Sequence, residues 1–331
     1  MKINIYSLLL ILAFAGPNYT LTAHHWRVSN LTGSVPQFST IQSAHDASGV
    51  LSGDTLYLEP SNVNYGDLTW TKKLVIIGNG YFLAGNPQTQ ANTTTSKLST
   101  ISIYHGASNA TITGCEIGNI NLIDTVSSVY IRRNLIGNIS FNGSYPGSHI
   151  HIIQNYITSG ISGSCSFSNS SIENNFIKDL NLSAAATATI LNNVIGGSLG
   201  LNSCTLRNNI ATCTSMQYPC GASLTNCSLH NNIGATTQFG TTNGNMSNVD
   251  MGTVFVCQGG GCSTYSSDGM FQLKQGSVAA GAGYGGIDCG MFAGNYPYVL
   301  SGMPPVPAIY FLNVQPQGDA MNVSVKIKSH N

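Results

Sequence analysis

The sequence predicts an all-β solenoid, in which short strands form coils that stack along one axis. A segment of the type Ile-x-x-Asn-x-Ile returns about every twenty residues, and a repeat of this length buries its apolar edge only by stacking on the next. Within each repeat the apolar residues are mostly two apart, which is the period of a strand. Glycine, at 37 of 331 residues, suits many tight turns.

The repeats carry one asparagine each, in the same apolar frame. The four clearest copies are Ile131–Ile136, Ile152–Ile157, Ile172–Ile177 and Ile190–Ile195, and their asparagines are 21, 20 and 18 residues apart. With two weaker copies downstream, the asparagines are Asn134, Asn155, Asn175, Asn193, Asn209 and Asn232; Cys115 holds the same slot upstream. We expect each amide to point inward and bond to the asparagine of the adjacent coil, forming an internal ladder.

The N-terminus predicts export. Lys2 precedes the apolar run 5–14, which Gly16 and Pro17 end, and this run is too short to span a bilayer. We therefore interpret residues 1–23 as a signal peptide, with an uncleaved anchor as the alternative. We expect no membrane span in the mature chain and a secreted, extracellular or cell-surface bacterial protein.

The two ends of the solenoid need covers, because an exposed strand edge invites association. In residues 24–52, Phe38, Ile41, Ala44 and Ala47 recur every third position and predict a short capping helix. We assign residues 53–292 to the solenoid. Residues 293–331 contain a proline-rich stretch and a terminal β-hairpin, which we expect to cover the C-terminal end or fold back along the coils.

The nine cysteines predict disulfides in an exported chain. Cys213 with Cys220, and Cys257 with Cys262, would each close a small loop. Cys204 and Cys227 each stand five residues before a ladder asparagine, so they should stack on neighbouring coils at about 4.8 Å, close enough for a bridge. A zinc site is the alternative, but the chain has no paired Cys-x-x-Cys, and we predict no metal site.

The residues that follow the ladder asparagines suggest a binding face. Their neighbours on both sides point inward, so they should point outward and stack into an exposed apolar stripe. They are Leu135, Tyr156, Phe176, Val194, Ile210 and Ile233. Two alternatives remain: these side chains stabilise neighbouring strands, or a loop or the hairpin covers them.

Three stretches resemble the right-handed parallel β-helix superfamily, the pectate-lyase-like fold. They are residues 38–58, the asparagine repeat, and residues 276–292. The resemblance implies a right-handed parallel β-helix over about residues 36–292, similar to secreted bacterial β-helix proteins. It implies little about activity, since the fold hosts lyases, hydrolases, epimerases and adhesins.

Enzymes of this superfamily mostly act on acidic polysaccharides. Its lyases use a base, often Lys or Arg, and often calcium, while its hydrolases use clustered carboxylates. No such motif matches here. The weak candidates are Arg132, Arg133, His151 and Glu173, which could form a cleft for an anionic sugar, with Glu173 about 10 Å from Arg132 in register. The alternative is an ordinary solvated face.

The charge balance excludes one class of partner. With twelve Lys and Arg, twelve Asp and Glu and no net charge, the chain lacks a basic footprint for nucleic acid. We therefore expect a non-catalytic protein without cofactors that binds a polysaccharide or cell-surface component on an elongated face. The alternatives are a polysaccharide lyase acting on an acidic glycan, with calcium in that case alone, and a passive structural or coat protein.

Overall fold

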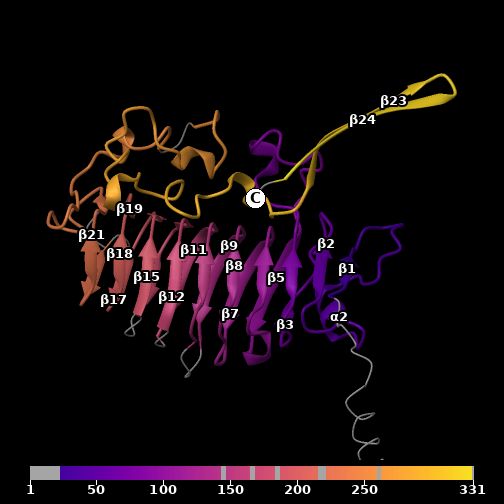
Figure 1. Ribbon diagram of the computed structural model, residues 1–331, viewed down its shortest axis with the longest axis horizontal. Coiled ribbons are helices and arrows are strands. Elements are labelled where there is room, and N and C mark those ends of the chain that lie inside the picture. The colour runs from indigo at the N-terminus through magenta and orange to yellow at the C-terminus, as the bar shows by residue number, and fades with distance from the viewer. Residues whose placement is uncertain are drawn as a thin grey trace, which may run out of the picture.

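The computed structural model describes residues 23–142, 147–164, 168–182, 187–214, 221–258 and 262–329. Parallel strands stand side by side in a long row, and the chain advances along the row from one coil to the next (Figure 1). In the described part of the chain the one α-helix is α2 (Ile41–Asp46). The predicted all-β solenoid is confirmed.

Two parallel sheets form the coils. Within the described residues the first sheet has ten strands: β1 (His25–Val28), β2 (Thr55–Leu58), β4 (Val75–Ile77), β6 (Thr111–Thr113), β8 (Tyr130–Arg132), β10 (His151–Ile153), β12 (Ser168–Glu173), β15 (Thr187–Leu191), β18 (Thr205–Arg207) and β21 (Ser228–His230). The second has twelve: β3 (Leu68–Trp70), β5 (Lys97–Ile103), β7 (Glu116–Leu122), β9 (Leu135–Phe141), β11 (Tyr156–Gly163), β13 (Phe176–Ile177), β14 (Leu180–Leu182), β16 (Val194–Ile195), β17 (Leu199–Asn202), β19 (Ile210–Ala211), β20 (Ala222–Thr225) and β22 (Ile233–Gly234).

A sharp corner joins a first-sheet strand to the next second-sheet strand. The residue before each ladder asparagine is left-handed, with φ between 52° and 61° at Arg133, Gln154, Asn174, Asn192, Asn208 and Asn231. This conformation bends the chain sharply at one residue, and Asn tolerates it better than most side chains. The isoleucines on either side then point into the coil, where Ile131, Ile152 and Ile172 pair in register and are almost fully buried.

The ladder asparagines form a hydrogen-bonded column inside the coils. Each Nδ2 donates to the Oδ1 of the next, at 3.2 Å for Asn134, 3.1 Å for Asn155, 3.0 Å for Asn175 and Asn193, and 2.9 Å for Asn209. Asn232 donates in the same way to Asn245, at 3.0 Å. At the other end, the Cys115 backbone N–H donates to Asn134 Oδ1, at 3.0 Å.

The N-terminal end differs from the predicted boundaries. The solenoid begins at β1 and not at residue 53, because β1 pairs in parallel with β2 and extends the first sheet. Helix α2 covers this end with Ile41 and Ala44 buried, and Thr40 caps it through a reciprocal pair of bonds with Ser43. The predicted signal segment lies outside the described residues, apart from Ala23.

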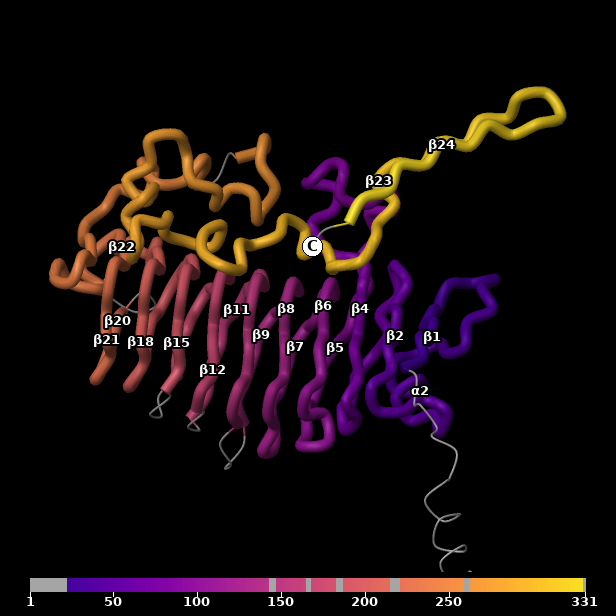
Figure 2. Tube along the Cα trace, in the orientation of Figure 1, coloured from indigo at the N-terminus to yellow at the C-terminus, as the bar shows by residue number. Residues whose placement is uncertain are grey.

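The C-terminal boundary also differs. The coil strands end at Gly234, not at residue 292, and the chain then returns along the outside of the stack (Figure 2). We call residues 246–303, apart from 259–261, the cover segment. It holds the short 3-10 turns η3 (Met251–Thr253), η4 (Gly269–Phe271), η5 (Tyr284–Gly286) and η6 (Leu300–Gly302). Two more lie earlier, η1 (Leu83–Gly85) and η2 (His105–Ala107).

The terminal hairpin is present, but its predicted position is wrong. Strands β23 (Ala308–Gln317) and β24 (Ala320–Lys328) pair antiparallel and project away from the solenoid, in yellow in Figure 1. They neither cover the C-terminal end nor fold back along the coils. The reason is that the cover segment first carries the chain back to the N-terminal coils, and the hairpin starts from there.

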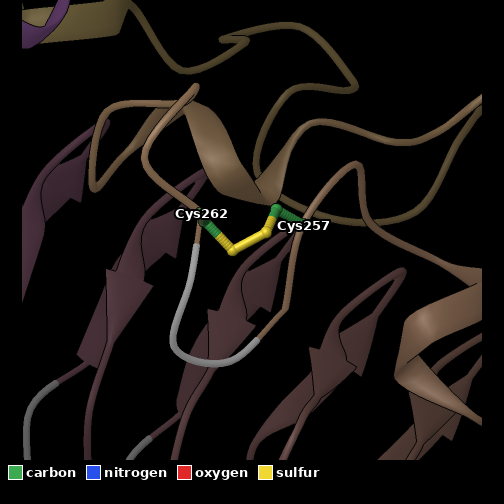
Figure 3. Close-up of a disulfide and its surroundings, with 2 residues drawn as sticks. All are labelled: Cys257 and Cys262. Carbon is green, nitrogen blue, oxygen red and sulfur yellow. A yellow bond between two sulfur atoms is a disulfide. The ribbon is translucent and has the colours of Figure 1, made fainter.

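The cysteines follow the predicted pairing in part. Cys257 and Cys262 form a disulfide with 6.0 Å between their Cα atoms (Figure 3). Cys213 is disulfide-bonded, and Cys220, its predicted partner, lies outside the described residues. The predicted Cys204–Cys227 bridge is not formed, and both side chains are thiols. Each thiol donates to a carbonyl two residues upstream, Cys204 to Asn202 and Cys227 to Thr225.

Candidate functional site

The apolar residues that follow the ladder asparagines do not form an exposed stripe, so this prediction is wrong. Val194, Ile210 and Ile233 are 0% exposed, and Leu135, Tyr156 and Phe176 are partly buried. The cover segment packs on them and builds a second core outside the coils. Its buried members are Met251, Val254, Phe255, Phe271, Ala279, Cys289, Met291 and Tyr298.

Aromatic rings in this second core stack on each other. Tyr156 lies parallel to Phe176 at 4.5 Å between centroids, and Phe176 lies parallel to Phe271 of the cover segment at 4.7 Å. Phe82 meets Tyr156 edge-on at 5.2 Å. Burial, followed by the nearby Asp268 carboxylate, raises the pKa of Tyr156 to about 12. The ring faces expected to bind a sugar therefore contact the protein itself.

The left-handed corner residues hold the cover segment in register. Asn231 Nδ2 donates to Ala282 O at 3.0 Å, Asn208 Oδ1 accepts from Tyr284 N at 2.8 Å, and Asn174 Nδ2 donates to Met291 O at 2.9 Å. Gln154 Nε2 donates to Pro297 O at 2.6 Å and Arg133 Nη1 to Met303 O at 3.0 Å. As the corner numbers fall, the partner numbers rise, so the cover segment runs against the direction of stacking.

A buried polar cluster fastens the end of the cover segment. Asp268 is 0% exposed and accepts from Ser301 N at 2.7 Å, Ser266 Oγ at 2.7 Å and Asn86 Nδ2 at 2.9 Å. Tyr81 and Tyr298 share a hydrogen bond of 2.6 Å beside it, and burial raises the pKa of both phenols well above the usual value. The cluster ties the loop around Tyr81 to the cover segment and is closed to solvent.

The four weak catalytic candidates do not form one cleft. Arg133 is 3% exposed and bonded to Gln154 and Met303, because its left-handed backbone turns the side chain under the cover segment. Burial, then the neighbouring Arg132, lowers its pKa to about 10. Arg133 therefore belongs to the packing of the cover, not to a sugar site.

The other three candidates share the outer face of the first sheet. Ile153 stands between Arg132 and Glu173 in register, so the two lie on alternate coils. His151 stacks on Tyr130 at 4.5 Å and its Nδ1 is hydrogen-bonded to Ser171 Oγ at 3.0 Å. Burial lowers the pKa of Arg132 and raises that of Glu173. Arg132 and Glu173 are therefore two coils apart on a partly buried face, and Ile153 between them is only 7% exposed.

A groove of about 920 Å³ lies between the first coils and the base of the hairpin. β1 and β2 with the residues after it form one side, the loop 78–92 contributes a second, and the hairpin and the prolines before it form the third. The lining includes His25, Arg27, Tyr57, Glu59, Ile77, Asn79, Gln90, Asn92, Pro304, Pro307, Ile309 and Leu312.

The groove combines polar and apolar surfaces. The His25 and Tyr57 rings are 5.8 Å apart, and Tyr57 is 36% exposed. Arg27 Nε and Glu59 Oε1 form an ion pair, and the hydrogen bond from Arg27 lowers the pKa of Glu59 despite partial burial. Asn79 Nδ2 donates to Asn92 O at 3.0 Å, which shapes the loop wall. Such a site fits a ligand with hydroxyl groups and apolar C–H faces.

Sequence reasoning missed this groove, because its lining comes from five stretches far apart in the chain. The alternation in Thr55–Leu58 does place Tyr57 on the outer face, since Leu56 and Leu58 point inward. No local signal shows that residues 304–312 return to the first coils, which depends on the path of the cover segment.

By its fold the protein is a parallel β-solenoid with one corner covered by its own C-terminal chain. Neither a protein-family model, nor a curated protein, nor a solved structure matches the sequence. Among the described residues, no group of three or more His, Cys, Asp or Glu side chains is placed to hold a metal ion. In the same residues no helix has the length and apolar character needed to cross a membrane.

Proposed function

We propose that this chain is a secreted or cell-surface, non-catalytic protein that binds carbohydrate in the groove between its first coils and its hairpin. The groove itself carries the proposal, because its volume of about 920 Å³ falls within the usual range for ligand sites. Membership of the pectate-lyase-like superfamily is part of the same proposal. The N-terminal apolar run and the Cys257–Cys262 disulfide support export.

The chemistry of the lining favours a sugar over a charged metabolite. Arg27 and Glu59 neutralise each other and offer donors and acceptors that suit hydroxyl groups. Tyr57 offers a ring beside them, and Ile77, Pro307 and Ile309 form an apolar wall for the C–H face of a pyranose. The ligand class that follows is a neutral or weakly charged glycan.

Binding of purified protein to a glycan panel, followed by calorimetry on the best ligand, tests the proposal. We expect Tyr57→Ala to weaken binding roughly five- to thirtyfold, since one stacked ring contributes roughly 1–2 kcal/mol. Tyr130→Ala is the matched control, because Tyr130 is 41% exposed on the same sheet but lies outside the groove. Equal loss in both variants, or no glycan bound at all, would contradict the assignment.

A second candidate, a lyase acting on an acidic glycan, is favoured by one observation. The Nε of Arg132 is buried without a hydrogen-bond partner, and burial lowers the Arg132 pKa, as a proton-abstracting base requires. Formation of unsaturated sugar from uronate-containing glycans, followed by ultraviolet absorbance, distinguishes the two. Turnover that disappears in Arg132→Ala would replace the binding proposal with catalysis.

A further inference from the structure

The hairpin has one wholly apolar face. Cross-strand partners share a face, and Leu312 pairs with Val325, Val314 with Val323, and Pro316 with Met321. Ile327 lies two residues beyond Val325 and pairs with Ile309, which extends the same face toward the groove. Ile309 and Leu312 line the groove, and we call the six side chains beyond it the hairpin face: Val314, Pro316, Met321, Val323, Val325 and Ile327. None of them carries a charge.

The opposite face of the hairpin combines lysines and other polar residues with two aromatic rings. Lys326 lies 5.2 Å from the ring of Phe311, and Lys328 lies 5.4 Å from the ring of Tyr310. The register shift between Ile309 and Phe311 places both aromatic residues on the lysine side. Asn313, Gln315, Asn322 and Ser324 complete this side. The two faces therefore differ sharply in polarity.

The hairpin face is uncovered in the single chain. Met321 is 65% exposed, Ile327 61%, Val323 54%, Val314 46% and Val325 45%. The ribbon extends away from the coils, so no other part of the described chain packs on its outer half (Figure 2). A two-stranded ribbon is marginally stable in water unless a further layer covers its apolar face. An apolar patch of this length marks an interaction surface.

We propose that the hairpin face docks on the hairpin face of a second copy of this chain. Two identical uncharged ribbons packed face to face make a two-layer sandwich, and a twofold axis brings each surface onto itself. The lysines then point outward, away from the contact. If these six side chains are covered, roughly 500 Å² leaves water on each copy, so about 1,000 Å² in all, which is the lower limit for a specific interface.

Sedimentation of the full protein at micromolar concentration, with one variant on each side of the hairpin, tests this pairing. We expect the wild type to sediment as a dimer and Val323→Glu as a monomer, because the new carboxylate would be buried between the ribbons. Ser324→Glu is the matched control on the polar face of the same strand and should remain a dimer. Far-UV circular dichroism checks that both variants stay folded.

A second measurement locates the contact. In a twofold pairing through the middle of the face, Val323→Cys should form an intermolecular disulfide under mild oxidation, whereas Ser324→Cys should not. A monomeric wild type, equal dissociation of both glutamate variants, or a mass that climbs without limit through edge-to-edge pairing would each overturn the proposal. Val323 lies outside the groove, so glycan binding by Val323→Glu is judged separately.

Discussion

Two neighbouring residues in each coil have different tasks, and this explains the paired asparagines of the sequence. In Asn174-Asn175, the first residue takes the left-handed corner and bonds outward to the cover segment. The second points inward and joins the ladder. The same division holds for Asn231-Asn232. Arg133 and Gln154 show that the corner accepts other polar residues when the next position remains asparagine.

Removing one ladder rung should destabilise the protein without changing its groove. In Asn175→Ala, Asn155 loses the acceptor of both its backbone N–H and its Nδ2, which stand 2.8 and 3.1 Å from Asn175 Oδ1. We expect a loss of about 1–3 kcal/mol in the free energy of unfolding, measured by urea denaturation. Asn119→Ala, at an exposed asparagine of β7, is the control. Similar losses in both variants would refute the role of the ladder.

Asp54 should make the N-terminal coil sensitive to acid. Burial raises its pKa, but bonds from His24 N, Leu51 N and Trp26 Nε1 outweigh this and leave the pKa lowered. A lowered pKa means that the stabilisation is complete above the unfolded pKa, roughly 3.9, and is lost as the pH falls through the folded pKa.

The matching experiment compares wild type with Asp54→Asn by urea denaturation across this acidic range. We expect the variant to be less stable at neutral pH and the difference between the two proteins to shrink as the pH falls below about 4. A difference that stays constant down to pH 2 would mean that the Asp54 carboxylate does not stabilise the fold through its charge.

At the scale of elements, the cover segment replaces the binding stripe by a second core. Its position depends on side chains at the corners, and Asn174 supplies two bonds, to Met291 O and Ala293 O. Phe271 adds a ring stacked on Phe176. The cover segment, which has little regular secondary structure, is therefore held in place by the repeating corner residues of the solenoid.

Removing the bonds between one corner residue and the cover segment should expose the aromatic residues beneath that segment. Asn174→Gly keeps the left-handed backbone, at φ 55° in the wild type, but removes both bonds to the cover segment. We expect faster hydrogen exchange in residues 288–298 and increased binding of a hydrophobic dye. Asn181→Gly, at an exposed position of β14, controls for the loss of an asparagine side chain. Unchanged exchange in 288–298 would show that packing alone holds the segment.

At the scale of the whole molecule, the sequence predicts the structural features that repeat from coil to coil. It does not predict the contacts that occur only once. The coil period, the inward asparagines and the hairpin strands follow from residue spacing, because stacking makes each repeat meet the next. The prediction of an exposed stripe is wrong because the exposure of Phe176 depends on Phe271, which lies almost a hundred residues later in the chain. The sequence does not predict the groove for the same reason, since Tyr57 and Ile309 line one site only because the chain returns along the solenoid.

The left-handed corner residues also show a pattern that spacing alone does not explain. Polar residues at positions 133, 154, 174, 208 and 231 resemble a solvated face, yet each bonds to the cover segment. The doubled asparagines have two functions, and only that of the inner residue follows from the apolar frame. The contacts of the outer residue with the cover segment cannot be predicted from the sequence, because their partners are far away along the chain.

Hydrogen exchange of the protein with and without its best glycan shows where on the molecule the glycan binds. We expect protection to be confined to residues 25–27, 57–59, 77–79, 90–92 and 304–312, the stretches that contain the groove-lining residues. Residues 130–136 and 171–177, on the outer face and beneath the cover segment, should exchange at the same rate in both samples. Protection of these two stretches, with the groove residues unchanged, would contradict the account.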